Sequence, residues 1–130
     1  MALSRRLRTE RPPGSLSLSG LGILGTLHRH GAIVATQMAV KERLQPQSLS
    51  RLLADLQGAR LIARARSESD RREIQITLTE KGRQVLIDDM ASRRAWLDNK
   101  IACALTAAER RTLLAAASIM VKLAAYERGP

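Results

Sequence analysis

The chain has 130 residues, a length typical of one domain that can bury a core of its own. It carries 22 Lys and Arg against 12 Asp and Glu, a formal net charge of +10, so its natural partner is a polyanion such as nucleic acid. The sequence has no run of eighteen apolar residues, which argues against a membrane span. Its single cysteine cannot form an internal disulfide. Both features favour a cytoplasmic protein that does not bind a membrane.

Three helices are expected before residue 45. Residues 1–10 form a short arginine-rich amphipathic segment that stops at Pro12-Pro13-Gly14. A second helix is expected from a cap at Ser17 or Ser19 to about His30, with Gly31 after its last turn. A third helix is expected over about residues 35–43, with Met38 turned toward the core.

The fourth helix is the most informative segment. It begins at Gln45-Pro46, where proline suits a first helical position, and it is expected to end before Gly58. An apolar stripe on one side of this helix is expected to pack against the rest of the protein, and the polar residues lie on the other side, where they can contact DNA. With the preceding helix this segment predicts a helix-turn-helix pair. The apolar stripe consists of Leu49, Leu52, Leu53 and Leu56, and the polar face includes Gln47, Ser48, Ser50, Arg51 and Asp55.

Two short strands are expected next, because their residues alternate with period two. Ala63 and Ala65 fall on one side and Arg64 and Arg66 on the other, and a second strand follows with Ile74, Ile76 and Leu78 facing one way. Arg64 and Arg66 are expected to contact DNA as part of the wing. The connection, Ser67-Glu68-Ser69-Asp70-Arg71-Arg72, has no Asn-Gly turn signal and predicts a wide, charged tip. Its two arginines can enter a minor groove, where narrowness concentrates negative potential; the alternative is that they are solvated surface charge.

Two helices close the chain. Thr79 caps a long one, and Thr106-Ala107-Ala108-Glu109 is a capping box that starts the last one. We expect both of these helices, together with the N-terminal one, to form a dimer interface. Its candidate residues are Leu3, Leu7, Leu113, Ala117, Met120, Val121 and Ala124. Cys103 lies beside alanines on the long helix, which favours a buried, inert thiol over a peroxide sensor.

Four short sequence motifs, in their order along the chain, resemble those of the MarR (multiple antibiotic resistance regulator) family of winged helix-turn-helix transcription regulators. They are Leu16-Ser17-Leu18, Pro46-Gln47-Ser48-Leu49-Ser50-Arg51-Leu52-Leu53, Asp70-Arg71-Arg72 and Leu78-Thr79-Glu80-Lys81-Gly82-Arg83. The resemblance covers about residues 16–126. It implies a homodimer, usually a repressor, that binds a palindromic operator and often releases it when a small effector enters a cleft between the DNA-binding and dimerisation parts.

The resemblance also implies roles for single residues. Gln47, Ser48, Ser50 and Arg51 would face the major groove, while Gln45, Thr36 and Gln37 would touch phosphates, with Pro46 in the same surface. For Arg51 the alternative is an ion pair with an acidic residue of a neighbouring helix. Asp70 resembles a brace that ion-pairs with an arginine and holds the wing tip, where Ser69, Arg71 and Arg72 lie. The chain departs from the family in carrying Glu42-Arg43 where members usually have a Leu-Gly pair.

The sequence therefore predicts a mainly α protein with a two- or three-stranded β-wing, forming a single domain over residues 1–130. About residues 16–80 would bind double-stranded DNA, and about residues 1–14 and 81–127 would dimerise. No catalytic constellation, metal-ligand spacing or cofactor motif is present, so we do not expect an enzyme. The alternative function is a basic module that binds nucleic acid or anionic membrane without reading sequence.

Overall fold

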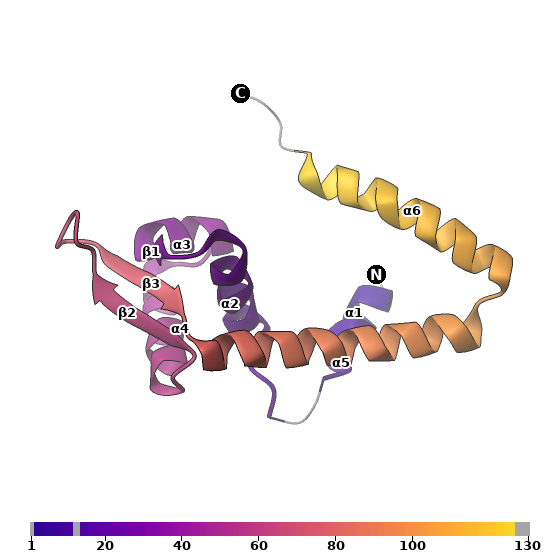
Figure 1. The fold of residues 1–130 in the computed structure, drawn as a ribbon, viewed down its shortest axis with the longest axis horizontal. Helices are drawn as coiled ribbons and strands as arrows, with labels where there is room; N and C mark the ends of the chain where they lie inside the picture. The colour runs from indigo at the N-terminus through magenta and orange to yellow at the C-terminus, as the bar shows by residue number, and fades with distance from the viewer. Residues whose placement is uncertain (1, 12–13, 127–130) are drawn as a thin grey trace. The chain divides into compact units, whose positions relative to one another are not determined.

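The computed structural model describes residues 2–11 and 14–126 (Figure 1). The predicted boundary at Pro12-Pro13 and the last residue of the predicted dimerisation part, 127, lie outside these ranges. In chain order the elements are α1 (Ala2–Thr9), α2 (Leu18–His30), β1 (Ile33–Val34), α3 (Ala35–Glu42), α4 (Pro46–Gly58), β2 (Ile62–Arg66), β3 (Ile74–Leu78), α5 (Glu80–Ala104) and α6 (Ala107–Ala125). The predicted fold class, mainly α with a small sheet, is confirmed.

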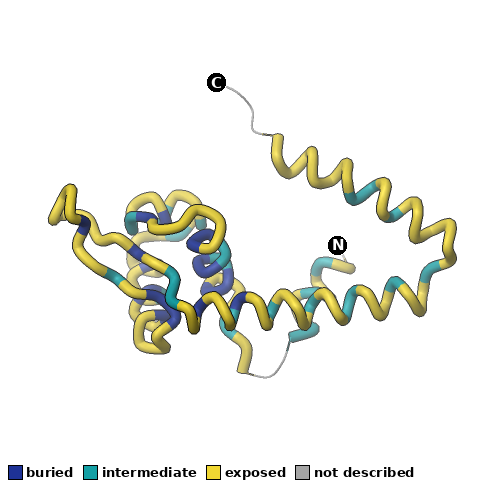
Figure 2. Tube along the Cα trace, viewed as in Figure 1, coloured by how far each residue is buried: buried dark blue, intermediate teal, exposed yellow. Residues whose placement is uncertain are grey.

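The chain divides into two compact units, residues 1–93 and 94–130, so that the boundary falls within α5. The first unit holds the sheet and the buried core, which is formed by α2, α3, α4, the strands and the start of α5 (Figure 2). Ile23, Leu24, Met38 and Ile76 are wholly inaccessible to solvent, which confirms the placement of Met38 in the core.

The strands form one antiparallel sheet in the order β1-β3-β2. β2 pairs with β3 along its whole length, and β1 pairs with the other side of β3, with Ile33 opposite Ile76. A strand as short as β1 shows no alternation of its own, which is why the sequence predicted only the hairpin strands explicitly. The predicted hairpin is confirmed, and β1 makes the sheet three-stranded.

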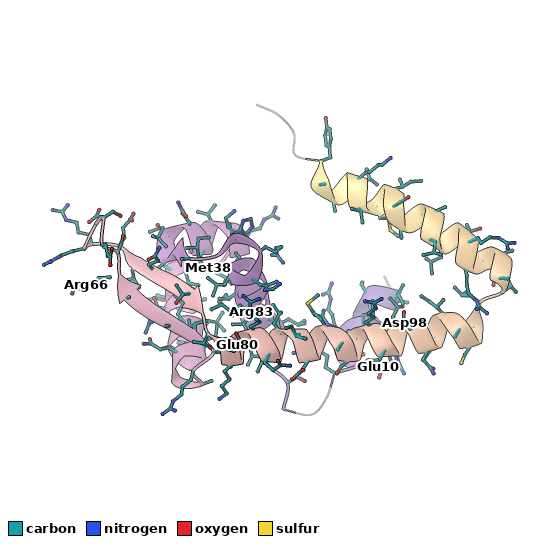
Figure 3. All side chains as sticks on the ribbon, in the orientation of Figure 1. Glu10, Met38, Arg66, Glu80, Arg83 and Asp98 are labelled. Atoms are coloured by element: carbon teal, nitrogen blue, oxygen red, sulfur yellow. The ribbon has the colours of Figure 1, made fainter. Side chains whose placement is uncertain are left out.

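Side chains directly opposite each other in adjacent strands share a face of the sheet. Arg64 lies opposite the buried Ile76, and Arg66 lies opposite Ile74. Both arginines are therefore on the same face as the buried Ile76 and the exposed Ile74. The face changes from apolar to basic along β2, from the buried Ile62 to the exposed Arg66 at the wing end (Figure 3).

Helix ends follow the expected caps with small shifts. Ser17 caps α2 by accepting a hydrogen bond from the N–H of Gly20 at 3.1 Å, and Gly31 follows with φ +75°. The third helix ends at Glu42 rather than Arg43, because Arg43 adopts the left-handed conformation with φ +52°. The fourth helix includes Gly58 instead of ending before it.

The start of α5 is attached to the end of α4. The hydroxyl of Thr79 accepts a hydrogen bond from the N–H of Gly82 and donates one to the carbonyl of Arg60, while its own N–H donates to the carbonyl of Leu61. The ammonium of Lys81 donates to the carbonyl of Ala59 at 3.0 Å. The three consecutive carbonyls that follow α4 are thus satisfied by Thr79 and the first turn of α5, and we call this arrangement the α4–α5 joint.

The second unit contains the end of α5 and all of α6. The predicted capping box is confirmed, since the Thr106 hydroxyl accepts from the N–H of Glu109 and the Glu109 carboxylate accepts from the N–H of Thr106. The Thr106 hydroxyl also donates to the Glu109 carboxylate at 3.1 Å. The bonds that this carboxylate accepts, first from the N–H of Thr106 and second from its hydroxyl, hold the pKa of the Glu109 carboxyl below its ordinary value.

Candidate nucleic-acid interface

The outer face of α4 presents all the polar residues that the sequence singled out there. Leu49, Leu53 and Leu56 are buried, which fixes how the helix is turned, and the six candidate residues of this helix are exposed. Arg51 makes no ion pair within the part of the chain that the structure describes, so the expected alternative of a structural ion pair is absent here. The six exposed candidates are Gln45, Pro46, Gln47, Ser48, Ser50 and Arg51.

The first turn of α3 carries the two candidates for phosphate contact. Thr36 and Gln37 are exposed, and with Val40 and Lys41 they line a shallow surface groove. The turn from α3 to α4 closes on Arg43, whose N–H bonds the carbonyl of Val40 at 3.2 Å. The left-handed conformation there is the one that glycine adopts most readily. The departure from the family's Leu-Gly pair thus leaves a helical turn in which arginine occupies a glycine-type position.

The wing tip is an ordered turn. The N–H of Ser67 donates to the carbonyl of Glu73 at 2.9 Å, and the Asp70 carboxylate accepts from the N–H of Arg72 at 2.9 Å. Within the described residues Asp70 makes no ion pair, so the arginine partner implied by the family resemblance is absent, and Asp70 braces the tip through the backbone. Arg71 and Arg72 are exposed, and neither forms an ion pair within the residues described. Ser69 bonds Ser67 through their hydroxyls.

The two strand arginines differ although they lie on one face of β2. Arg66 is exposed at the wing end, where Figure 3 labels it. Arg64 is partly buried, and its Nε donates a hydrogen bond to the side-chain oxygen of Gln57, in the last turn of α4, at 2.5 Å. Sequence reasoning missed Gln57. No local sequence pattern predicts that a side chain at the end of α4 bonds a strand residue seven positions later.

A cleft of about 460 Å³ lies within the first unit beside α2, the end of α3 and α5. Its charged lining comes from Arg29, Arg93 and Glu42. The Thr26 hydroxyl donates to the Glu42 carboxylate and accepts from Arg29 at 3.1 Å. Arg93 pairs with Asp89 at 2.7 Å, but its buried Nε has no hydrogen-bond partner in the described residues. The apolar lining includes Leu18, Leu21, Leu86 and Met90.

The predicted dimerisation residues lie in both units, and each set is described by itself. In α1, Leu3 is exposed and Leu7 is partly buried. In α6, Met120, Val121 and Ala124 are exposed, while Leu113 and Ala117 are partly buried. Further large apolar side chains of α6 are also uncovered, among them Leu114, Ile119 and Leu123.

The prediction of a buried thiol is wrong. Cys103 is free and exposed in the last turn of α5, because no other element packs over that side of the helix within the described residues. Among residues 2–11 and 14–126, no three His, Cys, Asp or Glu side chains are grouped closely enough to hold a metal ion. None of the described helices combines the length and the apolar character needed to cross a membrane.

Comparisons with known proteins agree with this geometry. The sequence profile of the MarR family matches residues 16–74. The HTH-type transcriptional regulator MT0903.1 of Mycobacterium tuberculosis is 34% identical over 123 residues, which are 95% of this chain and 85% of that protein. The HTH-type transcriptional repressor MdtR of Bacillus subtilis is 31% identical over 104 residues, covering 80% of this chain and 64% of that protein. These relatives are regulators of transcription and not enzymes.

Solved structures show the same fold. The crystal structure of a protein from Pseudomonas aeruginosa PA01 matches with a TM-score of 0.83 at 30% identity, covering 98% of this chain and 88% of that chain. An S. aureus MepR mutant bound to an oligodeoxyribonucleotide matches with a TM-score of 0.70 at 19% identity, covering 93% of this chain and 88% of that chain.

Proposed function

Because this chain belongs to the MarR family of transcriptional regulators, we propose that it binds double-stranded DNA as a homodimer and represses transcription from an operator with inverted symmetry. The observation that carries the proposal is the exposed polar face of α4 beside a wing whose tip arginines form no ion pair with any described residue. The MepR neighbour, which is bound to an oligodeoxyribonucleotide, and the MdtR relative, which is a repressor, support it.

The proposal assigns base reading to α4. The helix has its apolar side buried, so its other side is free to enter a major groove, which is wide enough to admit a helix. Gln47 and Arg51 carry the amide and guanidinium groups that form paired hydrogen bonds to base edges. Ser48 and Ser50 can bond either a base or a phosphate, and Gln45, Thr36 and Gln37 would fix the helix against the DNA backbone.

The wing would contact an adjacent minor groove. Arg66, Arg71 and Arg72 place three guanidinium groups at its end, and the backbone bond from Arg72 to Asp70 fixes the shape of the tip. Guanidinium groups are attracted to a narrow minor groove, where the negative potential is concentrated. The net charge of +10 adds a general attraction to phosphates that depends on salt.

Homodimerisation is proposed to use the apolar residues of α1 and α6. Large apolar side chains grouped on an exposed helix are typical of a protein–protein interface. A two-fold dimer presents two copies of α4, and their centres should lie about 34 Å apart, one turn of DNA, to enter successive major grooves on the same side. Its relatives named above come from bacteria, whose DNA lies in the cytoplasm, so the proposal places the protein there.

The cleft beside Glu42 is the proposed effector site. Its volume suits a small organic molecule, and the Nε of Arg93, which has no hydrogen-bond partner among the described residues, is a donor for a carboxylate. Benzoate should raise the melting temperature of the protein, whereas the uncharged benzamide should not. The Arg93→Met variant should lose the response to benzoate. An equal response to both compounds would contradict an anion site.

The deciding experiment for the proposed function is selection from a random duplex library at near-physiological salt, where nonspecific phosphate binding is weak. An enriched inverted repeat supports the proposal, and a reporter gene behind that sequence should be silenced by the protein. Strong but salt-sensitive binding without enrichment would identify a nonspecific nucleic-acid binder. Competition by anionic vesicles better than by duplex DNA would indicate a membrane-binding module.

A further inference from the structure

Within the described residues, one side-chain hydrogen bond joins α4 to the wing strands, and it lies between Gln57 and Arg64. Gln57 stands in the last turn of α4 and Arg64 in the middle of β2. The bond therefore joins the helix proposed to read bases to the strand that carries the wing. From the sequence, Arg64 is expected to contact DNA as part of the wing, whereas Gln57 has no predicted role.

Arg64 is held at both ends. Its strand position lies opposite Ile76, which is wholly buried, so the stem of Arg64 lies at the edge of the core. Its Nε is directed to the Gln57 side chain at 2.5 Å. Arg66 lies on the same face two residues further along, is exposed, and has no such partner within the described residues. The structure thus separates a fixed arginine from a free one.

A small change at Arg64 would be magnified at the wing tip. With a rise of about 3.3 Å per residue, β2 extends about 7 Å beyond Arg64, and half of the loop to Glu73 adds about 10 Å. Over a lever of about 17 Å, a rotation of about 10° moves the tip by about 3 Å, close to the spacing of successive base pairs along one strand, about 3.4 Å. The angle between α4 and the wing therefore decides which base pair the tip reaches.

We infer that Gln57 and Arg64 form a positioning pair that fixes this angle, and thereby sets the number of base pairs between the bases read by α4 and the flanking base pairs contacted by the wing. The inference rests on the proposed function. In it Arg64 acts through Gln57 and does not contact DNA itself. The remaining guanidinium N–H groups of Arg64 would also allow a phosphate contact, and the experiment separates the two roles.

The experiment compares selected sequences for the wild type and for Gln57→Met, Arg64→Met and the double variant. The single variants should keep the bases read by α4 but lose the preference at flanking positions, or shift its distance by one base pair. Their affinity for the wild-type sequence should fall about 3- to 10-fold, and the double variant should be no weaker than the Arg64→Met variant, because both changes break one bond. Arg64→Lys should not restore the flanking preference, since a lysine has a methylene group where arginine has its Nε–H.

Salt dependence provides the second readout. Gln57→Met removes no charge, so it should leave the slope of affinity against salt unchanged and should not weaken random-duplex binding. Arg66→Met is the contrast: it should weaken all duplexes and reduce the slope by about one. Gln84→Met is the matched control. It also deletes a glutamine side-chain hydrogen bond, to Asp88 within α5, and should give the wild-type flanking profile. Thermal unfolding by circular dichroism checks that each variant is folded.

The outcomes are distinct. If Arg64→Met behaves like Arg66→Met while Gln57→Met behaves like the wild type, Arg64 is a direct DNA contact and the inference is overturned. If all variants select the wild-type flanks at the wild-type distance, the pair has no positioning role. If the wild type enriches no sequence at all, the proposed function itself fails, and the inference fails with it.

Discussion

At the scale of single residues, the two helices of the helix-turn-helix end in the same unusual way. Arg43 and Arg60 are the non-glycine residues with positive φ in the described part of the chain, at +52° and +61°. The residue after each arginine donates a hydrogen bond back to the preceding helix. The N–H of Leu44 donates to the carbonyl of Ala39, and the N–H of Leu61 donates to the carbonyl of Leu56. These are Schellman turns, in which glycine is the usual residue. The arginines thus add positive charge near the proposed interface at some cost in backbone energy.

Replacing Arg43 by glycine should therefore stabilise the protein. The left-handed conformation costs a residue with a Cβ about 1 kcal/mol, and part of that gain is offset by the greater freedom of glycine in the unfolded chain. We expect Arg43→Gly to raise the free energy of unfolding by about 0.5–1 kcal/mol, measured by urea titration. Arg43→Ala is the control, because it removes the same charge but keeps the strained φ. Equal stability of the two variants would show that the backbone conformation is not the cause.

At the scale of elements, sequence patterns predicted the local features and missed the long-range ones. The caps at Ser17, Thr79 and Thr106 are hydrogen bonds within one helical turn, so residue types at fixed spacing suffice to predict them. The Gln57–Arg64 bond and the Arg11–Asp89 ion pair, at 3.1 Å, join residues that only the folded chain brings together. The polar face of α4 was predictable because its opposite face is a row of leucines.

The prediction for Cys103 failed for a related reason. Neighbouring alanines indicate a surface that another element can approach closely, but they do not show that any element does so. Burial is a property of tertiary packing, and in the described residues nothing covers that side of α5.

The α4–α5 joint depends on the absence of a side chain at Gly82. A Cβ there would lie 2.0 Å from the carbonyl oxygen of Leu61, which is backbone and cannot move aside easily. Gly82→Ala should lower the free energy of unfolding by about 2 kcal/mol or more, measured by thermal or urea unfolding. Gly58→Ala provides the comparison, since nothing lies within 4 Å of a Cβ at Gly58 and alanine is the better helix former. A neutral Gly82→Ala would mean that α5 is not held closely to the end of α4.

The capping box of α6 should show itself in a titration. The pKa of the Glu109 carboxyl is lowered from its ordinary value of 4.5 by the hydrogen bonds from Thr106, so the ionised form favours the folded cap. Its contribution is fully present above pH 4.5 and is lost as the pH falls through the lower pKa of the folded state. Carbon NMR of the Glu109 carboxyl measures this directly. In Thr106→Ala, which keeps the backbone N–H but lacks the hydroxyl, the pKa should rise part of the way back.

At the scale of the whole molecule, an inverted-repeat operator requires two recognition helices in one particle. The proposed operator therefore depends on the proposed dimer. Within its own unit, α6 leaves Met120 and Val121 more than half exposed, at 55% and 67%, although both lie on the stripe proposed for dimerisation. An interface between two copies would remove this apolar surface from water. The same reasoning predicts that a charge placed on the stripe should separate the copies.

Val121→Glu should shift the protein from dimer to monomer in sedimentation equilibrium at micromolar concentration, because the carboxylate would lose its hydration in an apolar interface. Ala115→Glu is the matched control: it introduces the same charge on α6, but its position is roughly opposite the Ala117 side of the helix, about 200° away at 100° per residue. The monomeric variant should also lose most of its affinity for an inverted repeat while binding a single half-site about as weakly as the wild type does, since each half-site is contacted by one protomer. A wild-type protein that sediments as a monomer would contradict the homodimer, and equal dissociation by both substitutions would show that the interface does not lie on the stripe.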